Sequence, residues 1–143
     1  MRLVLDTNIL VSSLLSTKTP PDLLYQAWKD GLFELISSQA QLDELARVLA
    51  YDRLKPLIPP GAAQKTVDTI NAKAIVLEEL PEVSLSPDPA DNFILAIAIA
   101  GKADYLVTGD KRDLLFLKEA EGIPIITARA ALEILSGHQA TGL

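Results

Sequence analysis

The stretch RLVLDTN, residues 2–8, decides the fold, because a short apolar run leads directly into an acid. Residues 2–5 are predicted to form a buried strand that ends at Asp6. Residues 9–15 follow with helical spacing, so that several of their apolar side chains can share one face. A strand joined to a helix through an acidic turn is a typical unit of an α/β domain.

The rest of the chain repeats this alternation of short apolar strands and helices. Further strands are predicted at residues 33–36, 74–77, 105–107 and 123–126. Helices are predicted at residues 20–29, from a cap at Ser37 or Ser38 through Leu49, and at residues 62–71, 90–100, 114–120 and 128–135. Proline-containing loops are predicted at residues 54–61 and 78–89.

Strands that are continuous apolar runs are typical of a parallel sheet that is buried on both faces. We therefore predict an α/β fold of one domain, with a short central parallel β-sheet flanked by helices on both faces. The domain is expected to span residues 1–136, and residues 137–143 are expected to form a flexible C-terminal tail.

Composition limits the class of protein. The chain has 143 residues, of which 49% are hydrophobic, and this suits one domain with a substantial core. No apolar run approaches the roughly 18 residues that a membrane span needs. Asp6 interrupts the apolar start, which argues against a secretion signal, so a cytoplasmic location is expected. The absence of cysteine excludes disulfides, thiolate metal sites and cysteine nucleophiles.

The net charge of −6 is opposite to the basic footprint of a protein that binds nucleic acid by neutralising phosphates. One interpretation is a solvated acidic surface. The other is that some carboxylates gather in one site, where a divalent metal ion neutralises them. The positions of the acids have to decide between the two.

Four acids occupy positions where a ligand site is expected. Asp6 and Asp110 follow predicted strands, and parallel sheets bind ligands beyond the carboxyl ends of their strands. Asp91 begins an apolar helix, and Glu44 lies within an earlier one. Each alone is explained as a helix cap or surface charge, whereas converging carboxylates require a cation to stay ionised together. Oxygen ligands favour Mg²⁺ or Mn²⁺, and such a site can activate water and stabilise charge on a phosphodiester.

Four segments resemble the motifs of the PIN-domain superfamily in the expected order. Residues 5–12, LDTNILVS, resemble its opening motif, and Glu44-Leu45 with Val48-Leu49 resembles its second acidic motif. Residues 88–92, DPADN, and residues 106–114, LVTGDKRDL, resemble the third and the fourth. Each motif alone is weak, but the four together cover the whole chain. The nearest branch is the group of bacterial and archaeal PIN toxins related to the VapC ribonucleases.

The resemblance implies a metal-dependent endoribonuclease that hydrolyses RNA phosphodiester bonds, the toxin of a toxin–antitoxin system. It implies Mg²⁺ or Mn²⁺ as the cofactor, an antitoxin protein as a partner that occludes the site with an arginine, and a homodimer. It assigns the metal to Asp6, Glu44, Asp91 and Asp110, with Asp113 competing with Asp110 and Asp88 competing with Asp91. The residues expected to support these acids are Thr7, Asn8, Asn92 and Thr108.

Two other functions are alternatives to the nuclease: phosphoryl transfer through an aspartyl-phosphate, and binding without turnover. Phosphoryl transfer through an aspartyl-phosphate of the haloacid-dehalogenase type needs a second acid two residues after the first, but Thr7 and Asn8 follow Asp6. A PIN-type module could instead bind RNA or protein without turnover. Basic residues that could contact phosphate are Lys111 and Arg112 beside the fourth motif, and Arg47, Arg53 and Lys55 near Glu44, although surface charge explains them equally well.

Overall fold

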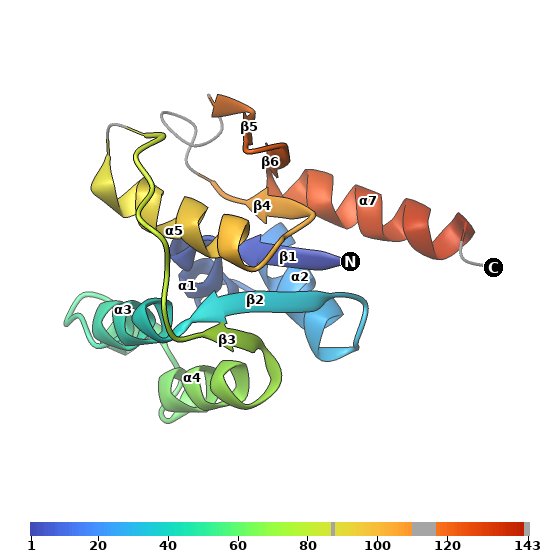
Figure 1. The fold of residues 1–143 in the computed structure, drawn as a ribbon. Helices are drawn as coiled ribbons and strands as arrows, with labels where there is room; N and C mark the ends of the chain where they lie inside the picture. Colours follow the sequence, from blue (N-terminus) through green and yellow to red (C-terminus); the bar gives the residue numbers. More distant parts are fainter. Residues whose placement is uncertain (87, 110–116, 142–143) are drawn as a thin grey trace.

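The structure is a computed structural model that describes residues 1–86, 88–109 and 117–141 (Figure 1). Its strands form one six-stranded sheet in the order β3-β2-β1-β4-β6-β5. All neighbouring strands are parallel except β5 and β6, which are antiparallel. The strands are β1 (Arg2–Leu5), β2 (Glu34–Ser38), β3 (Ile75–Leu77), β4 (Tyr105–Val107), β5 (Glu119–Ala120) and β6 (Ile123–Ile126).

Helices connect the strands, and their starts follow the expected capping rules. Ser38 rather than Ser37 caps α3, since its hydroxyl accepts a hydrogen bond from the Gln41 backbone at 3.0 Å. Pro20 begins α2, where its missing N–H costs nothing. The helical elements are α1 (Thr7–Leu15), α2 (Pro20–Lys29), α3 (Gln39–Leu49), the 3₁₀ turn η1 (Lys55–Leu57), α4 (Ala62–Lys73), α5 (Pro89–Ala100) and α7 (Ala128–Thr141).

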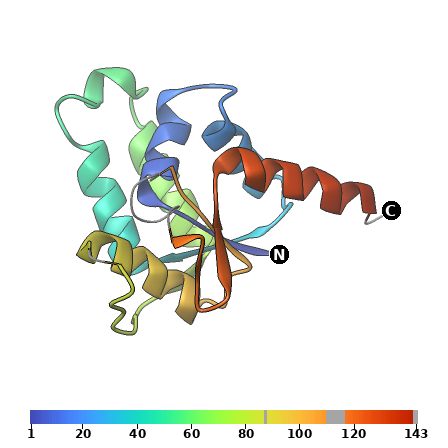
Figure 2. The ribbon, with the colours of Figure 1, turned by 90° about the horizontal axis from the view of Figure 1, so that it is seen from above.

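Each face of the sheet is covered by helices, as predicted. Leu3 and Leu5 of β1 pack into one core with α1, α2, α3 and α7, whereas Val4 packs into a second core with α5. This alternation follows from the two-residue period of a strand. Seen from above, α5 lies on one side of the strands and the other helices lie on the opposite side (Figure 2). The prediction of an α/β domain with both sheet faces buried is confirmed.

The end of α5 packs unusually close to the sheet. Gly101 caps this helix, and a Cβ atom there would overlap the side chain of Ile36 in β2. Ile36 is fully buried, so it has little room to move. Glycine at this position lets the apolar helix lie directly on β1, β2 and β4.

The prediction of a helix over residues 114–120 is wrong at its end. Glu119–Ala120 form β5, which pairs with β6, and residues 110–116 lie outside the described part of the chain. Glu121 and Gly122 both have positive φ, at 51° and 80°, as the two central residues of a type I′ hairpin turn do. Helical structure already ends before this hairpin, since Lys118 has a φ of 64° and β5 begins at Glu119.

The last helix is longer than predicted. It was expected to end at Leu135 before Gly137, but α7 continues to Thr141. A glycine inside a helix costs only about 1 kcal/mol relative to alanine, so Gly137 does not stop it. The flexibility of residues 137–143 stays a prediction. In the described residues, none of the helices has both the length and the apolar character that crossing a membrane requires.

Candidate metal centre

The candidate site lies at the carboxyl edge of the sheet, where the order of strands reverses. The chain adds β2 and then β3 on one side of β1, and it adds β4 and β6 on the other. Ligands of open parallel sheets bind at such a switch point. Asp6 follows β1 directly and Thr108 follows β4, and the Asp6 backbone N–H donates to the Val107 carbonyl at 2.9 Å.

Asp6 is held from both sides of this junction. Its carboxylate caps α1 by accepting from the Asn8 backbone at 3.3 Å, and its Oδ2 accepts from the Thr108 hydroxyl at 2.7 Å. Asp6 is only 8% exposed and Thr108 is fully buried. The structure thus gives Asp6 the capping role considered for it, together with a hydroxyl contact that a simple cap does not need.

Asp91 has a similar environment on another element. It lies in the first turn of α5 and is 6% exposed. Its Oδ2 accepts from the hydroxyl of Ser86 at 3.0 Å. Asp88, its competitor in the sequence, is exposed and caps α5 by accepting from the Ala90 backbone at 3.0 Å. Asp91 is therefore the buried carboxylate of the pair, and Asp88 lies at the rim.

Glu44 reaches the site from α3, which a buried glutamine anchors. Gln41, one turn before Glu44, donates to the Leu5 carbonyl at 2.8 Å and to the Thr7 hydroxyl at 3.4 Å. Its side-chain carbonyl accepts from the Ser37 hydroxyl at 2.6 Å. Gln41 is 1% exposed, so these bonds lie away from water. They fix the start of α3 against the end of β1, and thereby fix the position of Glu44.

These acids line one cleft with a volume of about 520 Å³. No lysine or arginine lines it among the described residues, so its wall carries mainly negative charge. Asp110 and Asp113, the candidates for a fourth ligand, lie outside the described part of the chain. The lining residues are Asp6, Asn8, Ile9, Ser12, Glu44, Asp88, Ala90, Asp91, Ile94 and Gly109.

The donor set fits a hard divalent cation. Carboxylate oxygens from α3, α5 and the end of β1 face the cleft, and Mg²⁺ and Mn²⁺ prefer oxygen ligands. Within residues 1–86, 88–109 and 117–141, no three acid or histidine side chains converge closely enough to bind a metal ion as they stand. The described part of the site is thus a set of acids around a cleft rather than a closed coordination shell.

The supporting residues predicted from the sequence have distinct contacts. Thr108 contacts Asp6 directly, whereas Thr7 contacts Gln41 and Asn92 contacts the backbone of Ser86. Asn8 lines the cleft. Gln41 and Ser86 were not predicted, because their partners are set by chain packing and not by a motif.

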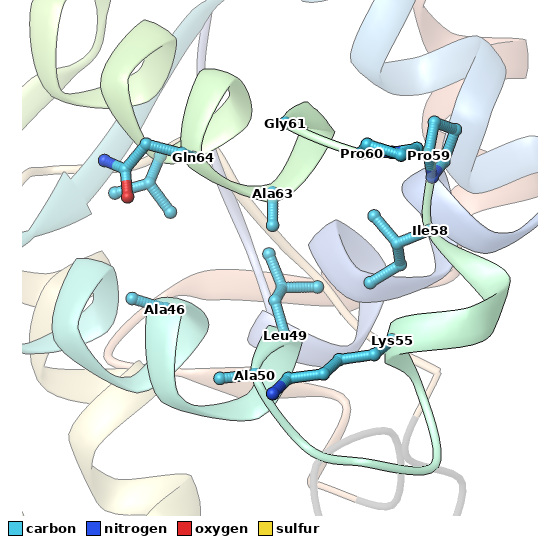
Figure 3. A pocket seen from close by; sticks show the side chains of 11 residues that line it. Ala46, Leu49, Ala50, Lys55, Ile58, Pro59, Pro60, Gly61, Ala63 and Gln64 are labelled. Carbon is cyan, nitrogen blue, oxygen red and sulfur yellow. The ribbon is translucent and has the colours of Figure 1, made fainter.

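A second cavity, of about 370 Å³, lies between α3, η1 and α4 (Figure 3). Its apolar lining includes Leu49, Ile58 and Val67, and Lys55 is the charged residue among the described residues that line it. None of these described lining residues carries a carboxylate. It therefore has none of the chemistry of the acidic cleft.

The chain belongs to the PIN domain family, since residues 2–112 match that family. Among solved structures, it is similar to a chain of VapBC2 from Rickettsia felis, which was crystallised bound to a DNA fragment from the VapBC2 promoter. The TM-score is 0.60 at 17% identity, over 89% of this chain and 98% of that chain. At this identity the likeness supports the fold alone. The sequences of characterised proteins give no significant match.

Replacing Gln41 with leucine is expected to lower the free energy of unfolding by about 2 kcal/mol. Leucine fills similar space but leaves the Leu5 carbonyl and the Ser37 hydroxyl buried without this partner, and each such loss costs roughly 1–3 kcal/mol. Urea denaturation measures the difference. Gln39→Leu on the exposed side of the same helix is the control and should change stability by less than about 0.5 kcal/mol. Equal effects of both substitutions would contradict the anchoring role of Gln41.

Proposed function

We propose that this protein is a metal-dependent endoribonuclease that hydrolyses RNA phosphodiester bonds. The observation that carries the proposal is that two buried carboxylates, Asp6 and Asp91, line one cleft from different elements at the switch point of the sheet. Buried carboxylates that share one cleft are costly unless a cation neutralises them. Membership of the PIN domain family also supports the proposal of a metal-dependent nuclease.

Asp6, Glu44 and Asp91 would hold Mg²⁺ or Mn²⁺, with Asp110 or Asp113 of the fourth motif as a further ligand. A bound divalent ion of this kind lowers the pKa of a water molecule and neutralises charge on the phosphate. The Thr108 hydroxyl would orient the Asp6 carboxylate, to which it donates a hydrogen bond. One carboxylate of the cleft would accept a proton from the attacking water, and Glu44, half-buried in the cleft wall, is our candidate for it.

Substrate binding should depend on the metal as well. The described wall of the cleft has acids and no basic side chain, so it repels a phosphodiester until a cation is present. Arg47 is exposed on α3 one turn beyond Glu44, where it can contact phosphate outside the cleft. Lys111 and Arg112 belong to the undescribed segment that carries Asp110.

We assign the protein to the toxin component of a toxin–antitoxin system. The structural neighbour belongs to a VapBC complex, and the acidic cleft is complementary to a cationic side chain of an inhibitory partner. A homodimer is proposed too, because the chain is apolar for its size, with a mean hydropathy of +0.25. Analytical ultracentrifugation of the purified protein tests the dimer, and co-expression with the product of the neighbouring reading frame tests the antitoxin.

The nuclease proposal predicts that RNA cleavage stops in EDTA and returns on addition of Mg²⁺ or Mn²⁺. The assay uses total RNA and single-stranded oligonucleotides, with product ends examined by gel electrophoresis. Cleavage that continues at full rate in EDTA would refute the metal mechanism. Mn²⁺ binding in a titration calorimeter without cleavage of any substrate would favour the alternative, a PIN module that binds RNA or protein without turnover.

A further inference from the structure

Ser86 occupies a distinctive position in the loop before α5. It is 6% exposed, although Ser84 and Leu85 just before it are exposed. Its hydroxyl lies 3.0 Å from Oδ2 of Asp91 and 3.2 Å from the backbone nitrogen of Asp88. Ser86 is therefore buried although the loop around it is exposed, and it contacts a buried carboxylate. This suggests that the serine has a role in the site as well as in the loop.

The two contacts fix the direction in which the hydroxyl donates. A backbone N–H can only donate, so the Asp88 amide takes a lone pair of the Ser86 oxygen. The single hydroxyl proton is then directed to Asp91 Oδ2. A hydrogen bond to an ionised carboxylate is stronger than one between neutral groups. The Ser86 hydroxyl therefore acts as an oriented donor to Asp91.

Asn92 holds Ser86 in place. Its side-chain oxygen accepts from the Ser86 backbone N–H at 2.8 Å, and its side-chain nitrogen donates to the Ser86 carbonyl at 2.8 Å. Both bonds join the loop to the helix residue next to Asp91. The Ser86 backbone is thus bonded to Asn92 while its hydroxyl contacts the neighbouring residue Asp91, and these contacts together hold the hydroxyl next to the carboxylate.

The same arrangement occurs on the other side of the cleft. Thr108, beyond the end of β4, donates its hydroxyl to Asp6 Oδ2 at 2.7 Å, as Ser86 does to Asp91 Oδ2. In both pairs the donor lies outside the helix at whose start the acid lies. Groups that hydrogen-bond metal-binding carboxylates orient them and contribute to metal affinity.

We propose that Ser86 is the positioning residue of Asp91, orienting its carboxylate for the metal ion, and that Asn92 acts by holding Ser86. This inference rests on the proposed metal-dependent function. It assigns to Asn92 an indirect role through the loop, in place of contact with the metal. Loss of the hydroxyl removes this hydrogen bond from Asp91 Oδ2, so the carboxylate is less firmly oriented and metal affinity falls.

The test is titration calorimetry with Mn²⁺ alone on the folded protein. Ser86→Ala is expected to weaken Mn²⁺ binding by about 10- to 100-fold. Ser86→Thr keeps the hydroxyl and is expected to restore affinity, and Ser84→Ala, an exposed serine of the same loop, is the matched control. Circular dichroism below the melting temperature verifies that each variant is folded.

Asn92→Ala is the second variant, and it decides the matter if Ser86→Ala does not fold. It leaves the Ser86 hydroxyl intact but removes both bonds that hold its backbone, so Mn²⁺ affinity is again expected to fall. Wild-type affinity in folded Ser86→Ala, or in Asn92→Ala where Ser86→Ala does not fold, would overturn the inference and leave the nuclease proposal standing. No Mn²⁺ binding by the wild-type protein would instead count against the nuclease proposal itself.

Discussion

Asp91→Asn is expected to lower metal-dependent RNA cleavage by at least about a hundredfold while the protein remains folded. Asparagine keeps the shape of the side chain but loses the negative charge that holds a cation. Without this carboxylate the metal ion stabilises the transition state less well, by several kcal/mol. A loss of about 3 kcal/mol in transition-state stabilisation already lowers the rate about a hundredfold. The measurement is the initial rate of oligonucleotide cleavage at saturating Mg²⁺, with and without the substitution.

Asp6→Asn should reduce cleavage to a similar extent. Asparagine is as good a helix cap as aspartate, so α1 should keep its start. The Thr108 hydroxyl can reverse its hydrogen bond toward the new amide. Removing one negative charge from a cluster of acids should leave the melting temperature in EDTA unchanged or raise it.

Asp43→Asn is the matched control, since Asp43 is exposed on α3 beside Glu44 and outside the cleft. It should cleave RNA at the wild-type rate. Undiminished cleavage in both Asp6→Asn and Asp91→Asn would rule out the assigned mechanism. Loss of cleavage in all three variants would indicate a general charge effect, and the two carboxylates would lose their special role.

Leu95→Ala is expected to lower the free energy of unfolding by about 2–5 kcal/mol. Leu95 is fully buried in α5, in the core that this helix forms with Val4 and Ile36 of the sheet. The close approach at Gly101 holds the helix against the sheet, so the cavity cannot easily collapse. A loss of this size is a large part of the roughly 5–15 kcal/mol that stabilises an ordinary domain.

Urea denaturation measures this effect, and Leu57→Ala is its control. Leu57 is 60% exposed in η1, so its truncation should change stability by less than about 0.5 kcal/mol. A loss below 1 kcal/mol for Leu95→Ala would mean that α5 contributes less to the core than its burial indicates. Folded Leu95→Ala should still bind Mn²⁺, since it keeps every carboxylate of the cleft.

The fold was largely predictable because its signals are local. Residues 2–5 and 105–107 are short apolar runs, and they form neighbouring central strands. Where prediction failed, tertiary structure outweighed local preference. Residues 114–120 are rich in leucine and have helical spacing, yet Glu119 and Ala120 pair with β6. The Glu121–Gly122 turn was the available signal, and it is weaker than the Asn-Gly or Asp-Gly pairs typical of hairpins.

The acids of the site were predictable for a different reason. A strand end and a helix start can both be located in the sequence, and Asp6 and Asp91 occupy such positions. Ser86 and Gln41 were not predictable, because a serine in a loop and a glutamine in a helix are ordinary surface residues. Their importance depends on burial, which only the packed chain reveals. The choice between Asp110 and Asp113 stays a prediction.

The pairing of Asp6 with Thr108 has a consequence for the timing of activity during synthesis. The two residues are separated by 102 positions in the sequence. Strand β4, which pairs with β1, ends directly before Thr108. During synthesis Asp6 is added 102 residues before Thr108, so β1 can pair with β2 before the Thr108 hydroxyl is there to contact the Asp6 carboxylate. Contacts of such sequence separation also form slowly, because a long loop must close first. A growing chain that has not yet reached Thr108 therefore lacks the assembled cleft, and we expect the proposed nuclease activity only after β4 and Thr108 have been made.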